Sequence, residues 1–377
     1  MVGESALSQV MRTLKELAYW LLVLSGLCWV ATRLNRRKLL VLLYHGVDSG
    51  SLDPLMNFDG LHVRRERFEQ QMNYLAAHYR VVPLDQLLDG RPGPDRGKPL
   101  AAITADDGYS NLYHHAYPVL KRLSLPATVF VITDYLQSGR ARWWDRMRAM
   151  VAATRIPAVR VPLGGTPRWL PLGTVAEKQA ALRAVARELQ SLPPGRREAL
   201  LARLAADLRV EGLAPATPRS LDADQLREMA SDGISIGSHG HSHDSFLHLN
   251  RAQLLAELAE SKRVLESVME RPVPWLAYPY GDFSPEVAAA AAEAGYRGAC
   301  TTIEQLNNGI PDPFAVRRMG VDDNMTLAHF IVATSGLRDF LKELRRACRF
   351  WRARFALGAP GWLERRRAAY VRDRGQA

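Results

Sequence analysis

The sequence predicts an α/β fold built on a barrel-like parallel sheet, and three observations lead to this prediction. Short apolar runs of strand length recur along the chain, and helical patterns such as 252–269 and 284–294 separate most of them. Strands that alternate with helices are typical of parallel βαβ units. About eight runs over a chain of this length favour a barrel-like sheet over a small open one. The predicted strands are 39–44, 79–82, 100–104, 127–132, 234–237, 275–278, 296–300 and 314–316.

Composition places the chain among ordinary folded proteins. Of its 377 residues 47% are hydrophobic and 24% charged, which is inconsistent with a disordered chain. Three cysteines, far apart and odd in number, give no indication of a disulfide framework or a cysteine-rich metal site. The net charge is +11, and the segment from Arg338 onward has 12 Lys/Arg against 4 Asp/Glu. No nucleic-acid recognition motif accompanies this charge, so we expect no nucleic-acid partner.

The N-terminal segment, residues 1–37, is predicted to associate with a membrane. Residues 17–32 carry no charge, and as a helix they would cover roughly 24 Å of a hydrocarbon core that is ~30 Å thick. Lys15 and Arg33 could extend this reach. We expect an uncleaved anchor or a helix in the membrane plane; a helix buried in the protein is the alternative. The basic residues of 33–38 favour a cytoplasmic catalytic domain, with a periplasmic or extracellular one as the alternative.

The first strand after this segment, 39–44, is an uninterrupted apolar run. Such a run is typical of a strand that is buried on both faces. The strand ends at His45. Phe68, Met72 and Leu75 then recur at helical spacing, so a helix should follow before the next strand.

One segment, about 136–219, interrupts the alternation of strands and helices. It contains Trp143-Trp144-Asp145, a Pro/Gly-rich run over 162–171 and two segments rich in Ala, Leu and Arg. We predict a helical, lid-like insertion between consecutive strands of the main domain, which itself covers 38–335. A small separately folding domain is the alternative.

The C-terminal segment, 336–377, is predicted to be a basic amphipathic tail. Its apolar residues lie on one helical face, and most of its arginines lie elsewhere. A helix of this kind suits an anionic membrane surface, although packing against the domain is an equal alternative. The apolar face comprises Leu337, Phe340, Leu341, Leu344, Cys348, Trp351 and Phe355.

Two acidic residues follow the strand at 100–104. Adjacent side chains of a strand point to opposite faces, so Asp106 and Asp107 can serve one site only if the backbone turns there. Gly108 permits such a turn. Active sites of parallel barrels lie at the carboxyl ends of the strands, where this pair is placed. An ordinary turn is the alternative.

A histidine cluster follows the strand at 234–237. His239 and His243 are four residues apart, a spacing that would place both imidazoles on one side of a helical turn, with His241 pointing away. Two histidines and a carboxylate, with a position left for water, form a common catalytic zinc set. A histidine-rich surface loop is the alternative.

With these motifs the sequence resembles the polysaccharide deacetylase family, also called the NodB-homology domain or carbohydrate esterase family four. Residues 104–109 (TADDGY) resemble the T-F-D-D-G signature, with Ala105 in place of Phe. Residues 236–243 resemble the H-x-x-x-H motif, and 277–281 (AYPYG) resemble R-P-P-Y-G. The resemblance extends over 39–322, apart from the insertion.

The resemblance implies a distorted (β/α)7 barrel that removes acetyl groups from N-acetylated sugars. Asp107, His239 and His243 would hold a divalent metal, normally Zn²⁺. Asp106 would be the general base that takes a proton from water. The backbone N–H of Tyr280 would help to stabilise the oxyanion.

Two departures from the family pattern require substitutes. Ala277 stands where the family has an arginine that orients the base, and Arg317 or Arg318 could take this role. The family's C-terminal L-x-H acid is also missing, since no histidine follows Phe330. His45 lies in Y-H-x-V, which resembles the start of the branch that contains poly-N-acetylglucosamine deacetylases. It could donate a proton to the leaving amine; a structural histidine is the alternative.

The sequence thus predicts a membrane-associated, metal-dependent deacetylase. Its substrate would be an N-acetylhexosamine-containing polysaccharide or a lipid-linked glycan, and the membrane surface would be a further partner. O-deacetylation by the same site is one alternative. A non-catalytic carbohydrate-binding relative is another, although a binding protein has no use for a base such as Asp106 beside a metal.

Overall fold

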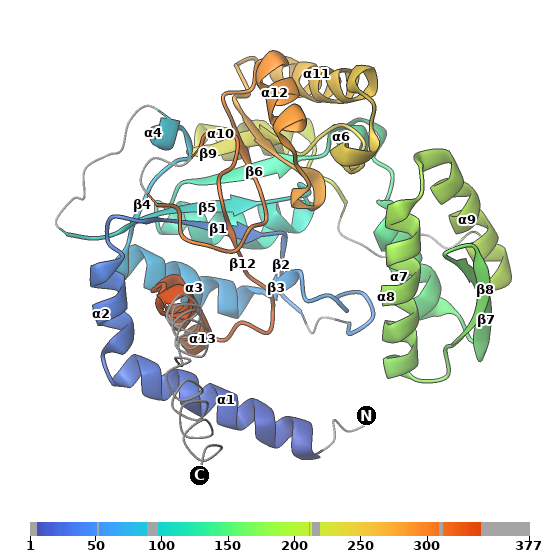
Figure 1. The fold of residues 1–377 in the computed structure, drawn as a ribbon, viewed down its shortest axis with the longest axis horizontal. Helices are drawn as coiled ribbons and strands as arrows, with labels where there is room; N and C mark the ends of the chain where they lie inside the picture. The colour runs from blue at the N-terminus through green and yellow to red at the C-terminus, as the bar shows by residue number, and fades with distance from the viewer. Residues whose placement is uncertain are drawn as a thin grey trace, which may run out of the picture.

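A curled parallel sheet of eight strands forms the centre of the molecule in the computed structural model (Figure 1). The structure describes residues 6–50, 53–88, 97–210, 212, 219–308 and 312–340. The strands follow the order β11-β10-β9-β6-β5-β1-β12, and β4 pairs with β5. Within the described residues β11 and β12 do not pair, so the expected barrel is an open half-barrel. The strands are β1 (Leu39–Tyr44), β4 (Arg80–Val81), β5 (Leu100–Ala105), β6 (Ala127–Val131), β9 (Ile234–Ser238), β10 (Trp275–Ala277), β11 (Gly298–Cys300) and β12 (Met319–Gly320).

The central strands are apolar because both faces of the sheet are covered. All six residues of β1 and of β5 are buried. Leu40, Leu42 and Tyr44 pack in one hydrophobic cluster, whereas Leu39 and Val41 pack in another. Alternate side chains of a strand point to opposite faces, so an uninterrupted apolar run fills both layers.

Helices connect the strands and cover the sheet, as the alternating pattern predicts. Two of them, α10 (Ala223–Ser231) and α11 (Arg251–Met269), begin with capping boxes, which satisfy free N–H groups of the first turn. A two-stranded parallel sheet, β2 (Gly46–Asp48) with β3 (His62–Arg64), follows β1. The helices around the sheet are α3 (Arg65–His78), α4 (Asp85–Leu88), α5 (Tyr117–Arg122), α10 (Ala223–Ser231), α11 (Arg251–Met269), α12 (Pro285–Glu293) and α13 (Leu327–Thr334), with short turns at Leu112–Ala116, Phe246–His248 and Pro279–Gly281.

One predicted strand, 314–316, is absent from the sheet. Asp312 forms a turn there: its side chain accepts a hydrogen bond from the Phe314 N–H, and its carbonyl accepts one from Ala315. Val316 forms only an isolated bridge with Cys300. The Val316 N–H donates to the Ala299 carbonyl, and the Val316 carbonyl accepts from the Thr301 N–H, so the segment lies along β11 without forming a regular strand.

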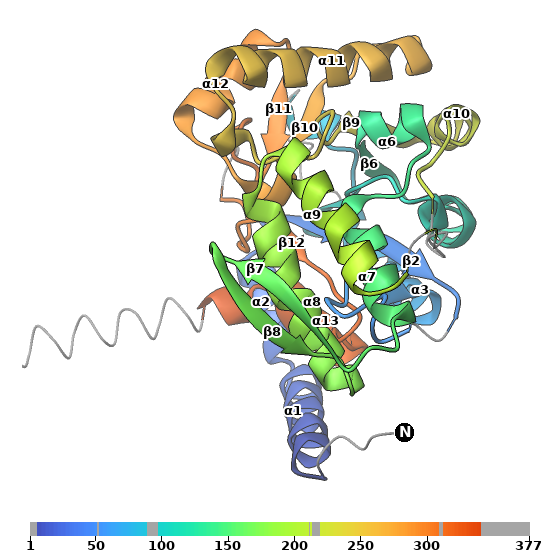
Figure 2. The ribbon, with the colours of Figure 1, turned by 90° about the vertical axis from the view of Figure 1, so that its right-hand side faces the viewer.

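The insertion has a hydrophobic core of its own and faces the viewer in Figure 2. It is helical, as predicted, except for an antiparallel hairpin of β7 and β8 in the Pro/Gly-rich run. Gly164 and Gly165 form the two-residue turn and have φ of 58° and 76°, the positive values that such hairpin turns require. The insertion comprises α6 (Thr133–Ser138), α7 (Trp143–Ala153), β7 (Ala158–Leu163), β8 (Thr166–Pro171), α8 (Val175–Ser191) and α9 (Pro194–Asp207).

The N-terminal segment forms two helices, α1 (Ala6–Leu24) and α2 (Leu27–Leu34), instead of the single one predicted. Gly26, with φ of 78°, separates them. Among the described residues no single helix is long and apolar enough to cross a membrane. Only the pair of segments 10–24 and 27–34 meets that requirement jointly, and the two are bent by 64°.

Both N-terminal helices contact α13, which lies with α3 between α1 and the sheet (Figure 1). The Tyr19 ring stacks on His329 with centroids 4.5 Å apart. Cys28 and Ala31 of α2 pack against Ile331. The expected continuous membrane helix is therefore a bent pair, one side of which packs on the domain. The predicted C-terminal tail lies outside the described residues beyond Phe340.

Candidate active site

The carboxyl ends of four parallel strands place the predicted site residues at one edge of the sheet. His45 follows β1, Asp106 and Asp107 follow β5, and His239 follows β9. Tyr280 lies in the turn after β10. In parallel sheets these ends meet at the same edge, which explains why distant sequence motifs converge.

Asp107, His239 and His243 form a buried group that could hold a metal ion. One ligand atom from each residue lies within 4.8 Å of the other two. Asp107 Oδ1 is 3.6 Å from His239 Nε2 and 3.5 Å from His243 Nε2. Tetrahedral ligands at roughly 2.0–2.1 Å from zinc are separated by about 3.4 Å. The three donors therefore fit such an ion and leave a fourth position available.

The backbone of this group is unusual. Asp107, His243 and Tyr280 have φ of 70°, 63° and 61°, values in the left-handed region that non-glycine residues seldom adopt. Residues 239–245 form a loop, so the predicted helical turn between the two histidines is wrong. The imidazoles approach each other because His243 adopts the left-handed conformation. Such strain is typical of functional sites, where the surrounding structure maintains it.

Hydrogen bonding and burial keep both imidazoles in a form that can bind a metal. His239 Nδ1 donates to the Ala277 carbonyl at 2.8 Å, which leaves Nε2 as the acceptor on the side of Asp107. Burial, followed by the nearby His239 and His45, lowers the pKa of His243 well below its ordinary value. His243 is therefore neutral at physiological pH.

Asp106 is held by Arg318 and not by a residue of the third motif. The Arg318 guanidinium donates two hydrogen bonds of 2.7 Å, one to each carboxylate oxygen, and both side chains are buried. Burial alone would raise the pKa of Asp106, but Arg318 and then His239 lower it below its ordinary value. Arg317 instead donates to Gln305. Of the two arginines expected as substitutes for the one missing at Ala277, Arg318 is therefore the one that contacts Asp106.

His45 and Tyr280 line the same cavity of about 190 Å³ as the metal group and Asp106. The Tyr280 ring lies 4.7 Å from that of His243. Within the described residues His45 Nδ1 and the Tyr280 hydroxyl have no hydrogen-bond partner. Burial raises the pKa of the Tyr280 hydroxyl, so this hydroxyl stays protonated.

A histidine that sequence reasoning overlooked, His329, lies elsewhere. Leu327-Ala328-His329 fits the L-x-H pattern, although it precedes Phe330. His329 stacks on Tyr19 of α1 and does not line the cavity. Apart from His239 and His243, the histidine that lines the cavity with Asp106 is therefore His45.

The insertion supplies the wall opposite the sheet. Trp143, Trp144, Met147, Arg148 and Ala186 line the cavity. The Trp144 ring lies 4.8 Å from that of His243. An apolar wall of this kind excludes water and strengthens electrostatic interactions in the cavity.

The insertion also supports the metal group from behind, through residues that the sequence analysis did not identify. Arg142, which is 1% exposed, donates to the Asp107 carbonyl at 2.8 Å. Its guanidinium lies 3.8 Å from the centroid of the Tyr109 ring. The Tyr109 hydroxyl in turn donates to Asp145, which pairs with Arg148 at 3.3 Å. The tripeptide Trp143-Trp144-Asp145 was the one signal for this network.

Comparisons with known proteins agree with the motifs. The polysaccharide deacetylase family model matches residues 93–156 and 205–299. YxkH of Bacillus subtilis, which is named as a polysaccharide deacetylase, is 22% identical over 304 residues, covering 80% of this chain and 77% of YxkH. The poly-beta-1,6-N-acetyl-D-glucosamine N-deacetylase of Staphylococcus epidermidis is 30% identical over 115 residues, covering 28% of this chain and 39% of that protein.

Two solved structures share the fold. The Streptococcus pyogenes deacetylase PplD in complex with acetate has a TM-score of 0.54 at 18% identity, covering 79% of this chain and 98% of PplD. IcaB from Ammonifex degensii has a TM-score of 0.51 at 19% identity, covering 79% of this chain and 97% of IcaB. At these identities the structures support the fold alone.

Proposed function

The chain is related to the polysaccharide deacetylases, and from this relation we propose that it removes N-acetyl groups from an N-acetylhexosamine-containing polysaccharide or lipid-linked glycan in a metal-dependent reaction. One observation carries the proposal. Beside the three converging donors of Asp107, His239 and His243, the Asp106 carboxylate lies 3.7 Å from His239 Nε2 and is held by Arg318. Metal ligands beside a separate base are what metal-assisted hydrolysis uses.

We propose that Asp107, His239 and His243 hold a divalent cation, for which zinc is the best candidate. Two imidazoles and one carboxylate match the protein ligands of known catalytic zinc sites. When bound, such a cation would lower the pKa of a water molecule and polarise the acetyl carbonyl.

The remaining groups would move protons and stabilise charge. Asp106 takes a proton from the attacking water, and its lowered pKa keeps it ionised and ready at neutral pH. The backbone N–H of Tyr280 donates to the developing oxyanion. His45 donates a proton to the amine as the carbon–nitrogen bond breaks. Acetate and the free amino sugar leave.

We propose N-deacetylation over O-deacetylation because of one relative. The Staphylococcus epidermidis relative is named as an N-deacetylase, and it supports amide hydrolysis here. O-deacetylation would use the same groups without the need for an acid to protonate an amine. A purely carbohydrate-binding role remains the third candidate, and it leaves Asp106 without a function.

Acetate release tests the proposed function. Purified protein is incubated with N-acetylglucosamine oligomers, lipid-linked precursors and O-acetylated sugars, before and after metal removal by a chelator. We expect release from N-acetylated substrates, loss with chelator and recovery when zinc is added. Release from O-acetylated sugars alone would make the protein an O-deacetylase instead. Release that resists the chelator would contradict the metal dependence.

We also propose that α1 and α2 rest on a membrane surface. Their exposed apolar side chains support this, because isolated soluble domains seldom expose so large an apolar area. Exposed tryptophans are typical of the lipid–water interface, and the basic residues near both helices suit anionic lipids. The basic segment 33–38 predicts that the catalytic domain lies on the cytoplasmic side of this membrane. The exposed residues are Val10, Met11, Leu14, Leu17, Trp20, Leu21, Leu24, Leu27, Trp29, Val30 and Leu34.

Flotation with vesicles of phosphatidylcholine and phosphatidylglycerol tests this location. Leu21→Glu with Leu24→Glu should abolish flotation, because both side chains are exposed and would place charge in the lipid. Trp169→Glu is the matched control, since Trp169 is an exposed apolar residue on β8. Equal flotation of the double variant and the wild type would contradict the proposal.

A further inference from the structure

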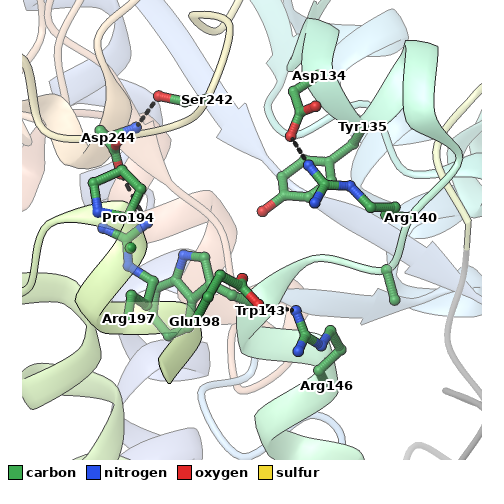
Figure 3. A pocket seen from close by; sticks show the side chains of 12 residues that line it. Asp134, Tyr135, Arg140, Trp143, Arg146, Pro194, Arg197, Glu198, Ser242 and Asp244 are labelled. Atoms are coloured by element: carbon green, nitrogen blue, oxygen red, sulfur yellow. Dashed lines mark hydrogen bonds and ion pairs between the residues drawn. The ribbon is translucent and has the colours of Figure 1, made fainter. Parts of the chain in front are cut away.

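A second cavity of about 510 Å³ lies beside the candidate active site, between the start of α7, the start of α9 and the loop after His241. Three ion pairs surround it (Figure 3): Arg140 with Asp134 at 2.8 Å, Arg146 with Glu198 at 2.7 Å and Arg197 with Asp244 at 2.7 Å. We call it the ion-pair cavity. The insertion contributes most of its wall.

The ion-pair cavity adjoins the cavity of the metal group. Trp143 lines both. Ser242 and Asp244 line the ion-pair cavity and flank His243 in sequence, whereas His243 lines the metal cavity. Trp143 therefore lies at the border of the two cavities, where a ligand that reached from one to the other would pass.

The sizes of the two cavities indicate a ligand longer than one unit. The metal cavity, at about 190 Å³, is smaller than the roughly 300–1,000 Å³ of typical small-molecule sites. The ion-pair cavity lies within that range. An acetamido group with part of its sugar ring fits the first, and the second has room for a further ring.

The chemistry of the ion-pair cavity favours an uncharged, hydroxyl-rich ligand. Each of its arginines is balanced by a carboxylate, so an added anion or cation would meet no net opposite charge. Guanidinium and carboxylate groups nevertheless keep further N–H donors and lone pairs beyond a single ion pair. Among the residues that the structure describes, the Trp143 indole N–H is buried without a hydrogen-bond partner, and Tyr135 adds a hydroxyl. Sugar hydroxyls can use both kinds of group.

We propose that the ion-pair cavity binds the sugar unit next to the one that is deacetylated. The substrate is then an oligosaccharide or polysaccharide of at least two units, and the insertion determines this requirement. This inference rests on the proposed deacetylase function and deepens it.

The test compares substrate lengths in variants of one ion pair. Arg146→Ala and Glu198→Gln each disrupt the same pair, and both side chains are partly exposed, so folding should be retained. Arg203→Ala is the control, because Arg203 lies on α9 with Glu198, pairs with Asp207 and does not line the cavity. For each protein, kcat/KM is measured with N-acetylglucosamine and with its dimer and tetramer.

We expect the wild type and Arg203→Ala to prefer the oligomers. In Arg146→Ala the ratio of kcat/KM for the oligomers to kcat/KM for the monomer should fall about tenfold, which is the effect of one charge-assisted hydrogen bond. The change should lie mainly in KM for the oligomers, and the monomer should be unaffected. An unchanged ratio of oligomer to monomer, or an equal loss for both, would overturn the proposal.

A binding measurement separates this inference from the proposed function. The affinity of the wild type for the dimer and tetramer is measured by calorimetry after metal removal, so no turnover is needed. Binding that weakens in Arg146→Ala but not in Arg203→Ala supports the sugar site even if no acetate is released from any substrate. Acetate release without any difference in oligomer binding between these variants refutes the site and leaves the deacetylase proposal intact.

Discussion

The sheet edge and the insertion meet at one cavity, but they differ in what they provide. The sheet edge provides the groups to which we assign chemical roles: Asp106, the three donors of the metal group and His45. The insertion provides an aromatic wall and a buried arginine, Arg142, that contacts only the backbone of the metal group. Reactive groups thus come from short motifs at strand ends, whereas their surroundings come from a separately packed segment.

This difference also separates the two arginines beside the acidic pair. Arg318, next to β12, donates to both side-chain oxygens of Asp106, whereas Arg142 donates to the carbonyl of Asp107. Changes at the sheet edge should therefore affect the reaction itself, and changes in the insertion should affect the geometry of the metal group. The following variants can break or sharpen that distinction.

The largest effect is expected for Asp106→Asn. The amide cannot accept a proton, so kcat should fall by roughly 10²–10⁴-fold, the usual contribution of a general base. Metal content, measured by elemental analysis, should stay at the wild-type level, because Asp106 is not one of the three donors. Wild-type activity in this variant would remove Asp106 from the reaction.

Arg318→Met should be next in size. It leaves the buried carboxylate of Asp106 without its partner, a change that typically costs about 3–5 kcal/mol. Urea unfolding measures the loss of stability, and the pH profile of kcat should shift to higher pH because the pKa of Asp106 rises. Arg317→Met is the control, and equal effects at the two positions would contradict the assigned role of Arg318.

Arg142→Lys should weaken metal binding without removing any ligand. The lysine ammonium cannot reproduce the planar contact with Tyr109, so the Asp107 turn loses support. Outer contacts of this kind are worth roughly 10–100-fold in metal affinity. Titration of the metal-free protein with zinc measures this loss of affinity. Arg187→Lys, at an exposed position of α8, is the control. Unchanged zinc affinity would mean that the insertion does not position Asp107.

The smallest effect concerns Asp145, whose pKa is raised to about 6 by burial, against the opposing influence of Arg148 and Arg142. The folded state holds this proton more tightly than the unfolded chain, so raising the pH through about 6 reduces stability. Relative to Asp145→Asn, the wild type should lose about 1 kcal/mol of unfolding free energy between pH 5 and pH 7. If the unfolding free energies of the wild type and Asp145→Asn, measured with urea, changed equally with pH, this prediction would be contradicted.

The sequence predicted the sheet-edge residues well because each follows a strand directly. Asp106, Asp107 and His239 are fixed by the ends of β5 and β9, which the apolar runs located. The helical turn between His239 and His243 was wrong, because the left-handed backbone at His243 depends on its surroundings. The pairing of Arg318 with Asp106 joins residues 212 positions apart, and the sequence narrowed this role only to Arg317 or Arg318.

The insertion was less predictable for a related reason. Its helices follow from periodicity, but the contact of Arg142 with Asp107 depends on how the whole segment packs. No local pattern separates this buried arginine from the exposed arginines around it. The N-terminal helix was predicted as one element because its apolar composition continues through Gly26, where the backbone turns.

The hydrogen bond from Arg142 to the Asp107 carbonyl has a consequence for protein engineering. The insertion has its own core and resembles a module that could be deleted to obtain a minimal enzyme, or exchanged to alter specificity. Yet Arg142, which directly precedes α7 of the insertion, donates to the backbone of the candidate metal group. A shortened chain would have to retain Arg142 and α7, or replace the hydrogen bond to Asp107. The same holds for a chain in which another insertion takes the place of this one.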